Sequence, residues 1–457
     1  MTFLEISSAF WLLAMLSGSV IVLCIKNYHA VIIAFCIGGV PLTALLKTVY
    51  GYSATKTFIV IIALEVVLLV FDKEAVVRFR KSKRFLQYCL WVGLIYVLLL
   101  VTYTVSAKTA YAVYYMQFFS VYVTASCLAG LLAVQRALKI EEVLLPMMVF
   151  FACSYPTFNS TVTHMSPVVL ESEVGARVLE GIGGIKLGRL AGALTVLAFC
   201  ILWERSSHKG QKLVMLESAL AFSICLPMLW FAQTRQSIIA AFVTIETQLL
   251  FLVVLRKGRS VRRLLLGCVA AILIIWASWT FLEWAGEHLA QVRVHRIADF
   301  QRFHRWKSVW EGICEKPVTG HGLGGYYSQH GIWPHNWILE AWHDYGVIGL
   351  LLLCVPIITI LSKSYLAPRG HFSWAILGSY WVIVAQASGD IPRNSTVFFF
   401  FTVVFFRAIM EQKNAKVGSS EKNVRRYEGS RVDVRDCGRR AFEKMSRRRA
   451  VRSDEVA

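Results

Sequence analysis

Residues 85–102 read FLQYCLWVGLIYVLLLVT, a run of 18 residues without a charged side chain. An α-helix needs about 20 such residues to cross the ~30 Å hydrocarbon core of a membrane, so this run predicts a membrane-spanning helix. The loop before it carries a group of basic side chains that includes Arg78, Arg80, Lys81, Lys83 and Arg84. Because short basic loops stay on the cytoplasmic side, the chain should enter this span from the cytoplasm.

Apolar runs of similar kind recur along the whole chain. Of its 457 residues, 56% are hydrophobic and 17% are charged, too few polar groups to cover the outside of a soluble protein. We expect spans near residues 9–24, 30–46, 57–71, 85–102, 112–134, 143–153, 190–203, 213–232, 238–255, 264–284, 338–361, 372–388 and 396–410. The expected fold is an all-α, polytopic integral membrane protein with about 12–13 transmembrane helices, since the first two runs are short.

The net charge of +20 reports topology rather than a nucleic acid partner. Its basic residues gather in the C-terminal tail and in short loops between apolar runs, at 72–84, 204–212 and 256–263. Loops of this kind mark the cytoplasmic side and attract anionic membrane lipids. The eleven cysteines are scattered singly, without a CxxC or Cys/His cluster, so neither a zinc site nor a disulfide framework is expected.

Alternation from the basic loops predicts the domain organisation. Residues 1–410 form the transmembrane domain, with outer loops at 154–189 and 284–336 and a short outer turn at 233–237. Residues 411–457 form a basic cytoplasmic tail that lacks apolar periodicity, and we expect it to be disordered.

The outer segment 284–336 holds the residues suited to chemistry. Residues 291–314 have helical spacing, which places Arg302, Trp306 and Val309 on one face and Arg305 one turn from Arg302. The sequence Glu315-Lys316-Pro317 should end that helix. A glycine-rich run follows at 320–325, where glycines permit backbone conformations closed to other residues.

The next motif opens the helix that returns into the membrane. It consists of Pro334, His335 and Asn336, followed along the helix by Gly346 and Gly349, where small residues should let helices approach closely. His335-Asn336, nine residues, Gly346, two residues and Gly349 resembles the pattern of the O-antigen ligase family.

Two further stretches are similar to the region that these ligases share with O-antigen polymerases. Arg302 stands four residues before Trp306, and Pro317 follows eleven residues later, with Gly320 and Gly322 after it. Upstream, residues 233–237 (Gln-Thr-Arg-Gln-Ser) resemble the family's outward-facing arginine turn. The resemblance is specific over about 230–350.

The resemblance implies a fold similar to the membrane-embedded glycosyltransferase C superfamily. It implies transfer of O-antigen polysaccharide from undecaprenyl diphosphate to a sugar of the lipid A core, with inversion. The reaction would need no metal, nucleotide or other cofactor. The protein would lie in a Gram-negative inner membrane, with its active site facing the periplasm.

Arginines suit a reaction with a lipid diphosphate leaving group. The guanidinium group stays cationic, and its planar fork binds phosphate oxygens in bidentate fashion. Arg235 and Arg302 are the expected diphosphate ligands, with Arg305 beside them. The alternative for Arg235 is an arginine whose head reaches the lipid headgroups.

A sugar hydroxyl becomes a good nucleophile only when a base takes its proton. His335 is the expected base, because histidine titrates near neutral pH. Asn336 would orient His335 or a substrate hydroxyl, or cap the helix. His321, His330 and His343 remain possible substitutes, although His343 is expected to pack along the helix.

Other interpretations of the same residues stay open. Trp306, Trp310 and Trp333 could stack on sugar rings or belong to an interfacial tryptophan belt. An O-antigen polymerase would use the same donor with a lipid-linked acceptor, and the His-Asn motif favours the ligase. A transporter of lipid-linked sugars would use the arginines only to line a path.

Overall fold

The computed structural model describes residues 27–37, 54–71, 83–106, 110–151, 184–205, 212–231, 235–255, 298–366, 372–386, 391–407 and 442. The expected spans 9–24 and 264–284 lie outside these residues, as do most of the outer loop 154–189 and most of the tail 411–457. The chain divides into two compact units, residues 1–405 and 406–457. The helices below belong to the first unit, except that the last of them ends in the second.

The described residues are mostly helical and contain no strand, which confirms the all-α membrane fold. The named helices are α3 (Ala54–Phe71), α5 (Lys83–Val105), α6 (Ala110–Gln135), α10 (Gly184–Arg205), α11 (Lys212–Phe231), α12 (Arg235–Leu255), α14 (Ala298–Glu315), α15 (Gly325–His330), α16 (Trp337–Leu366), α17 (Phe372–Ala385) and the 3-10 helix η1 (Pro392–Asn394). Asn27–Ile37 and Thr396–Arg407 are further apolar helices, and residues 141–151 are helical too.

Within the described ranges, three helices are long and apolar enough to cross a membrane: Phe85–Val105, Tyr111–Gln135 and Trp337–Lys363. Every other expected span that falls in these ranges is also helical where it is described. The total of 12–13 spans includes residues outside them and stays a prediction.

One face of α5 shows why the sequence forms a membrane helix rather than a buried one. Leu86, Leu90, Leu94, Val97 and Val101 recur at spacings of three and four residues and are all exposed. Such a stripe of exposed apolar side chains fits contact with lipid tails, while the opposite side of the helix faces protein. There the Trp91 indole donates a hydrogen bond to the Leu352 carbonyl of α16 (3.2 Å).

Small residues and buried hydroxyls join the interior helices. Gly130 of α6 lies against Thr402 of the helix Thr396–Arg407, and a Cβ at this glycine would lie 2.7 Å from the Thr402 Cβ. The Tyr88 hydroxyl of α5 lies 2.7 Å from the Thr402 Oγ1. Tyr380 of α17 likewise covers a glycine of α10 and donates to the Arg189 carbonyl (2.8 Å). Close backbone approach and interhelical hydrogen bonds are what hold helices together in lipid.

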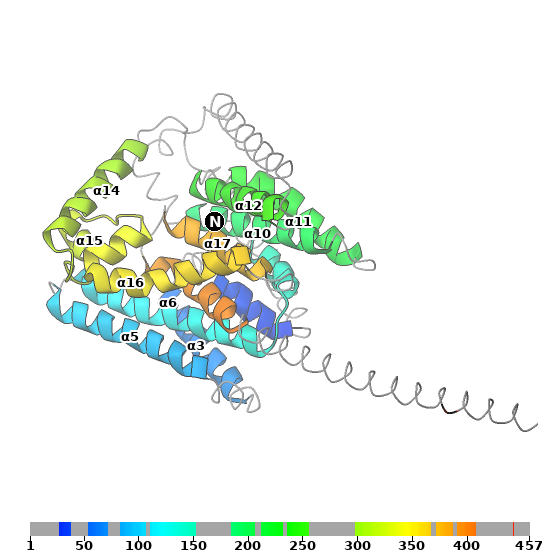
Figure 1. Ribbon diagram of the computed structural model, residues 1–457, viewed down its shortest axis with the longest axis horizontal. Coiled ribbons are helices and arrows are strands. Elements are labelled where there is room, and N and C mark those ends of the chain that lie inside the picture. The colour runs from blue at the N-terminus through cyan, green and yellow to red at the C-terminus, as the bar shows by residue number, and fades with distance from the viewer. Residues whose placement is uncertain are drawn as a thin grey trace, which may run out of the picture. The chain divides into compact units, whose positions relative to one another are not determined.

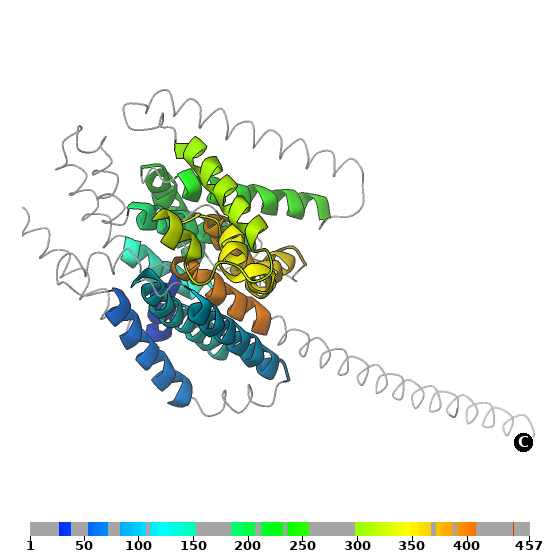
Figure 2. The same ribbon diagram turned by 90° about the vertical axis from the view of Figure 1, so that its left-hand side faces the viewer.

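The helices fall into two groups that meet through α17. Helices α10, α11 and α12 pack together, and α17 contacts both α10 and α12 (Figures 1 and 2). Helix α17 also packs on α16, which contacts α5, α14 and α15. Helix α15 and η1 both contact α6. His335 immediately precedes α16. The start of α16 lies close to α14, α15 and the end of α17.

Candidate active site

The segment 298–336 is a folded helical cap on α16, not a loose loop. Val309 and Ile313 of α14 form a small core with Tyr326 of α15, and Leu339 and Trp342 of α16 pack against it. Burial raises the pKa of the Tyr326 phenol, while the Ser308 hydrogen bond and nearby positive charge lower it. The expected end of the helix at 315–317 is confirmed, because α14 ends at Glu315.

The glycine-rich run docks by its backbone onto a break in α16. Gly346, inside α16, has φ 67° and ψ −167°, which is not helical. The amides of His321 and Gly322 donate to the carbonyls of His343 (2.9 Å) and Asp344 (3.0 Å), just before this break. A Cβ on Gly320 would lie 2.6 Å from the Asp344 carbonyl oxygen, so only glycine fits so close a backbone contact.

The expectation that Gly346 lets two helices approach each other is wrong, because a loop and not a helix lies against it. A Cβ on Gly346 would collide with the Val318 carbonyl of the docked loop. A Cβ on Gly349 would collide with Tyr345 of the same helix. Gly346 thus serves the break in α16 and the loop that fills it.

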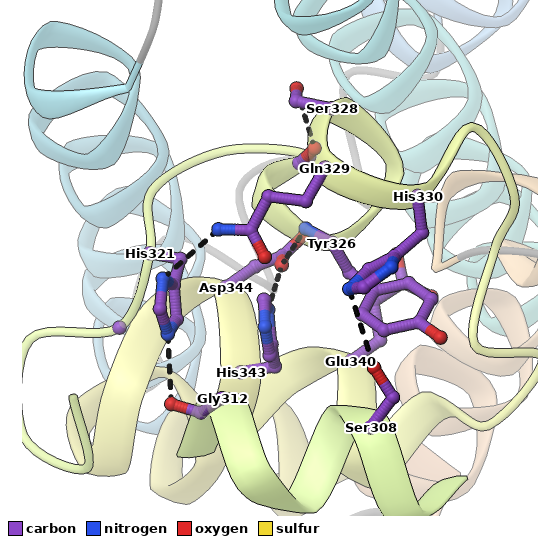
Figure 3. A network of polar contacts seen from close by, with 12 residues as sticks. Ser308, Gly312, His321, Tyr326, Ser328, Gln329, His330, Glu340, His343 and Asp344 are labelled. Atoms are coloured by element: carbon purple, nitrogen blue, oxygen red, sulfur yellow. Dashed lines mark hydrogen bonds and ion pairs between the residues drawn. The ribbon is translucent and has the colours of Figure 1, made fainter. Parts of the chain in front are cut away.

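A polar network beneath α15 fixes the cap, as Figure 3 shows. The His343 Nδ1 donates to Asp344 Oδ1 (2.8 Å), which also accepts the Tyr326 amide (3.2 Å). The His321 ring stacks on the His343 ring with centroids 4.4 Å apart. His321 Nε2 donates to the Gly312 carbonyl (2.8 Å), and its Nδ1 accepts from Gln329 (3.3 Å).

These contacts give His321 and His343 a structural role. His321 uses both ring nitrogens within the cap, and His343 is buried in it. Neither is therefore suited to replace His335 as a base. His343 is buried along its helix, as expected, and its Nδ1 also lies 2.8 Å from Asp344 Oδ1. His330 is exposed, and its Nε2 lies 3.3 Å from the Ser308 hydroxyl.

His335 has an unusual backbone held from both sides. Its φ is 56°, in the left-handed region that few residues other than glycine adopt. The Trp306 indole donates to the Pro334 carbonyl (3.1 Å), which fixes the residue before it. Asn336 caps α16 by accepting the Leu339 amide (3.0 Å) and donates to the Gln386 carbonyl (3.2 Å). Its side chain is therefore engaged with the protein.

The structure places the expected arginines on two helices. Arg235 is the first residue of α12, and Arg302 lies on α14 one turn before Trp306, which contacts the segment carrying His335. The side chains of Arg235 and Arg302 lie outside the described part of the chain. Arg305 is half-buried, and its carbonyl accepts a hydrogen bond from the Tyr326 hydroxyl (3.4 Å).

Two charged residues near His335 are absent from the sequence-based site. Glu340 is buried in α16, and its Oε1 accepts from the Tyr115 hydroxyl (2.6 Å) and the Ile391 amide (3.3 Å). Arg393 in η1 places its guanidinium carbon 4.1 Å from the centroid of the Trp333 ring. The sequence contains a signal for each residue. A carboxylate in an apolar run, such as Glu340, is costly and marks function or structure. For Arg393, alternation of spans puts the loop 389–395 on the same side as His335.

Within the described ranges, no three His, Cys, Asp or Glu side chains are placed to hold a metal ion. What the arrangement offers chemically is the half-buried imidazole of His335 on a fixed backbone, beside the Trp333 ring that Arg393 also contacts, at the start of α16.

Comparison with known proteins points to a family for the part of the chain that carries the site. A family model described as O-antigen ligase matches residues 220–354, from the middle of α11 to just past the middle of α16. No curated protein matches the chain significantly. The matched range includes Arg235, Arg302 and the whole motif from His335 to Gly349. This family groups membrane enzymes, ligases and polymerases, that act on lipid-linked saccharides. Over residues 220–354, the chain is similar to the O-antigen ligase family.

Proposed function

We propose that the protein is an O-antigen ligase, which transfers polysaccharide from undecaprenyl diphosphate to a sugar of the lipid A core. The site would face the periplasm at the inner membrane of a Gram-negative bacterium. One observation carries the proposal: His335 holds a left-handed backbone, clamped by Trp306 on one side and by the Asn336 cap on the other. Costly backbone conformations persist where surrounding contacts enforce them, and they cluster at functional sites.

In the proposed reaction, Arg235 and Arg302 bind the diphosphate of the donor, with Arg305 near them. Their charge stabilises the phosphate oxygens as the bond between the anomeric carbon and the bridging oxygen breaks. The electron pair of that bond leaves with the undecaprenyl diphosphate. A general acid is unnecessary, because a diphosphate is a good leaving group.

On the opposite face of the sugar, an acceptor hydroxyl attacks the anomeric carbon. His335 takes the proton of this hydroxyl as the new glycosidic bond forms, a role typically contributing about 10²–10⁴-fold in rate. Attack opposite to the leaving group inverts the anomeric configuration in a single step. Asn336 acts through His335, because its amide caps α16 and contacts the end of α17.

The acceptor distinguishes ligase from polymerase. Purified protein in lipid nanodiscs is given a lipid-linked polysaccharide together with either lipid A core or a lipid-linked repeat unit. A ligase joins the polysaccharide to the core and leaves the lipid-linked repeat unchanged. Extension of the lipid-linked repeat instead would identify a polymerase, and the absence of any glycosidic product would favour a transporter.

A deletion strain gives the same distinction in cells. Loss of a ligase leaves lipid-linked polymer and core without O-antigen. Loss of a polymerase leaves core that carries single repeat units, which would contradict the proposal.

A further inference from the structure

The loop between α17 and the helix Thr396–Arg407 reaches the site from a distant part of the sequence. Its 3-10 helix η1 packs on α6, and Arg393 at its centre is exposed. The guanidinium carbon of Arg393 lies 4.1 Å from the centroid of the Trp333 ring. Trp333 is two residues before His335, and the two rings lie 6.3 Å apart. One side chain therefore connects this loop directly to the neighbourhood of the proposed base.

The support beneath Arg393 is built from several elements. Trp333 donates its indole hydrogen to the Tyr111 hydroxyl of α6. Tyr111 stacks on Tyr327 of α15 with centroids 3.7 Å apart, and Tyr327 lies 5.0 Å from Trp333. We call Tyr111, Tyr327, Trp333 and Arg393 the aromatic–arginine cluster. Its rings are half-buried, so the cluster is a packed structure and not a single side chain on a surface.

The loop itself is anchored from within the protein. The buried Glu340 of α16 accepts the Ile391 amide (3.3 Å), two residues before Arg393. The Asn394 amide donates to the Ile391 carbonyl (3.1 Å), which closes the 3-10 turn around Arg393. The Arg393 backbone is therefore fixed to α16, the same helix that His335 precedes.

This placement suits the recognition of an anion. Attraction to an indole face helps to orient a guanidinium. The planar N–H fork of arginine matches the paired oxygens of phosphate or carboxylate. Aromatic rings beside it offer apolar surface to the C–H faces of a sugar. An anion attached to a saccharide can pair with the guanidinium through its oxygens and contact the rings through its sugar.

We propose that the aromatic–arginine cluster is an additional binding subsite, in which Arg393 binds an oxyanion attached to the saccharide or lipid substrate next to His335. The transfer assay for this subsite rests on the proposed function, whereas the binding test does not. The oxyanion has two possible sources with the same chemistry: the diphosphate of the donor, or a phosphate or carboxylate on the acceptor core. Arg393 would be a specificity-determining residue and not the base.

The test compares variants at Arg393 with a matched control on the same outer cap. Arg393→Gln removes the charge, and Arg393→Lys keeps the charge but loses the fork. Lys307→Gln is the control, because Lys307 is an exposed cation of α14 that pairs with Glu311 one turn away. Thermal unfolding of each purified variant establishes that it is folded.

Binding is measured in nanodiscs with undecaprenyl diphosphate, with phosphorylated core oligosaccharide and with the same core after dephosphorylation. We expect Arg393→Gln to weaken the binding of one of the two phosphorylated probes at least tenfold. The affinity of Arg393→Lys should lie between those of Arg393→Gln and the wild type. Weakened undecaprenyl diphosphate binding assigns the subsite to the donor. Weakened binding of phosphorylated core alone, with dephosphorylated core unaffected, assigns it to the acceptor. If both Arg393 variants bind every probe as Lys307→Gln does, the inference is overturned.

Transfer kinetics separate this inference from the proposed function. We expect Arg393→Gln to raise KM for the affected substrate about tenfold, with kcat changed less than threefold. Wild-type transfer with unchanged KM in Arg393→Gln would refute the subsite and leave the ligase proposal standing. Arg393-dependent binding without any transfer by the wild type would refute the ligase proposal and leave the subsite standing.

Discussion

At the scale of single residues, the backbone of His335 connects structure to function most directly. A left-handed conformation costs an L-residue roughly 1–2 kcal/mol, and glycine or asparagine tolerates it better than alanine. His335 holds this conformation at φ 56° because Trp306 and Asn336 fix its neighbours. The imidazole thus starts from a position that the fold imposes on it.

This backbone predicts an order of stability that differs from the order of activity. We expect His335→Gly to be more stable than His335→Ala by about 1 kcal/mol, because glycine adopts positive φ without a Cβ clash. Both variants should lack transfer activity. Thermal unfolding in detergent and a transfer assay measure the two effects. An active glycine variant would contradict the role of the imidazole.

The control is Ala137, which also has positive φ (49°). It follows α6, where the Leu138 amide donates to the Ala133 carbonyl in a helix-terminating turn typical of glycine. Ala137→Gly should stabilise the protein by roughly 0.5–1 kcal/mol and leave transfer unchanged.

Glu340 provides a second prediction at this scale. Its carboxylate accepts the Tyr115 hydroxyl at 2.6 Å while buried. Hydrogen bonds to charged groups contribute about 1.5–3 kcal/mol, so Tyr115→Phe should destabilise the protein by an amount in that range. A double-mutant cycle with Glu340→Gln should show coupling of at least about 0.5 kcal/mol. Additive effects of the two substitutions would mean that the charge of Glu340 does not strengthen this hydrogen bond.

At the scale of elements, the break in α16 is what shapes the site. It receives the loop 317–320, since the Val347 amide donates to the Pro317 carbonyl (3.0 Å) and Gly346 lies against Val318. The loop continues into α15 and the cap. The break therefore determines where the cap lies on α16, near His335.

Gly346→Ala should disturb the cap more than the membrane helices. A Cβ there meets backbone atoms that cannot rotate away, and positive φ adds strain, so we expect a loss of at least about 2 kcal/mol together with loss of transfer. Gly93→Ala on α5 is the matched control, because a Cβ at Gly93 would have no other atom within 4 Å. It should be neutral or stabilising by up to about 1 kcal/mol. Equal effects of the two substitutions on stability would contradict this account of the break.

The same elements show what the sequence predicts and what it does not. The apolar run 85–102 predicts α5, and the proline at 317 predicts the end of α14 to within two residues. The break at Gly346 is not predicted, because the apolar run around it continues and helix periodicity does not reveal a docked loop. The stack of His321 on His343 follows only from that docking, so the spacing of these histidines could not reveal it.

Arg393 and Glu340 illustrate the same limit within the site. Local patterns place Arg393 in a short loop on the outer side, but its contact with Trp333 joins residues 60 positions apart in the chain. Motif reasoning locates His335, Asn336 and Trp306 because they lie in one continuous stretch. Partners supplied by a separate element require the packed structure.

At the scale of the whole molecule, the orientation of the membrane domain is the main prediction. The basic loop before α5 fixes the cytoplasmic side, and alternation of spans puts α14 outside. Cys314 is an exposed thiol in the last turn of α14. It should react with a membrane-impermeant maleimide in cells whose outer membrane is permeabilised, and Cys314→Ser should remove that labelling.

Cys437, in the basic tail, is the internal control for the opposite side. It should be labelled only after the inner membrane is opened. The reverse pattern, with Cys437 labelled first and Cys314 protected, would place His335 on the cytoplasmic side and contradict the proposed function.

We propose that His335 is the base in the formation of a glycosidic bond at the start of α16. The most direct measurement is transfer by purified protein in nanodiscs, with lipid-linked polysaccharide, lipid A core and no added metal or nucleotide. The wild type should join polysaccharide to core with inverted anomeric configuration. His335→Asn, which also tolerates the left-handed backbone, should remain folded and lose at least about 100-fold in rate, because a positioned base contributes about 10²–10⁴-fold. Wild-type rates in His335→Asn would contradict the account.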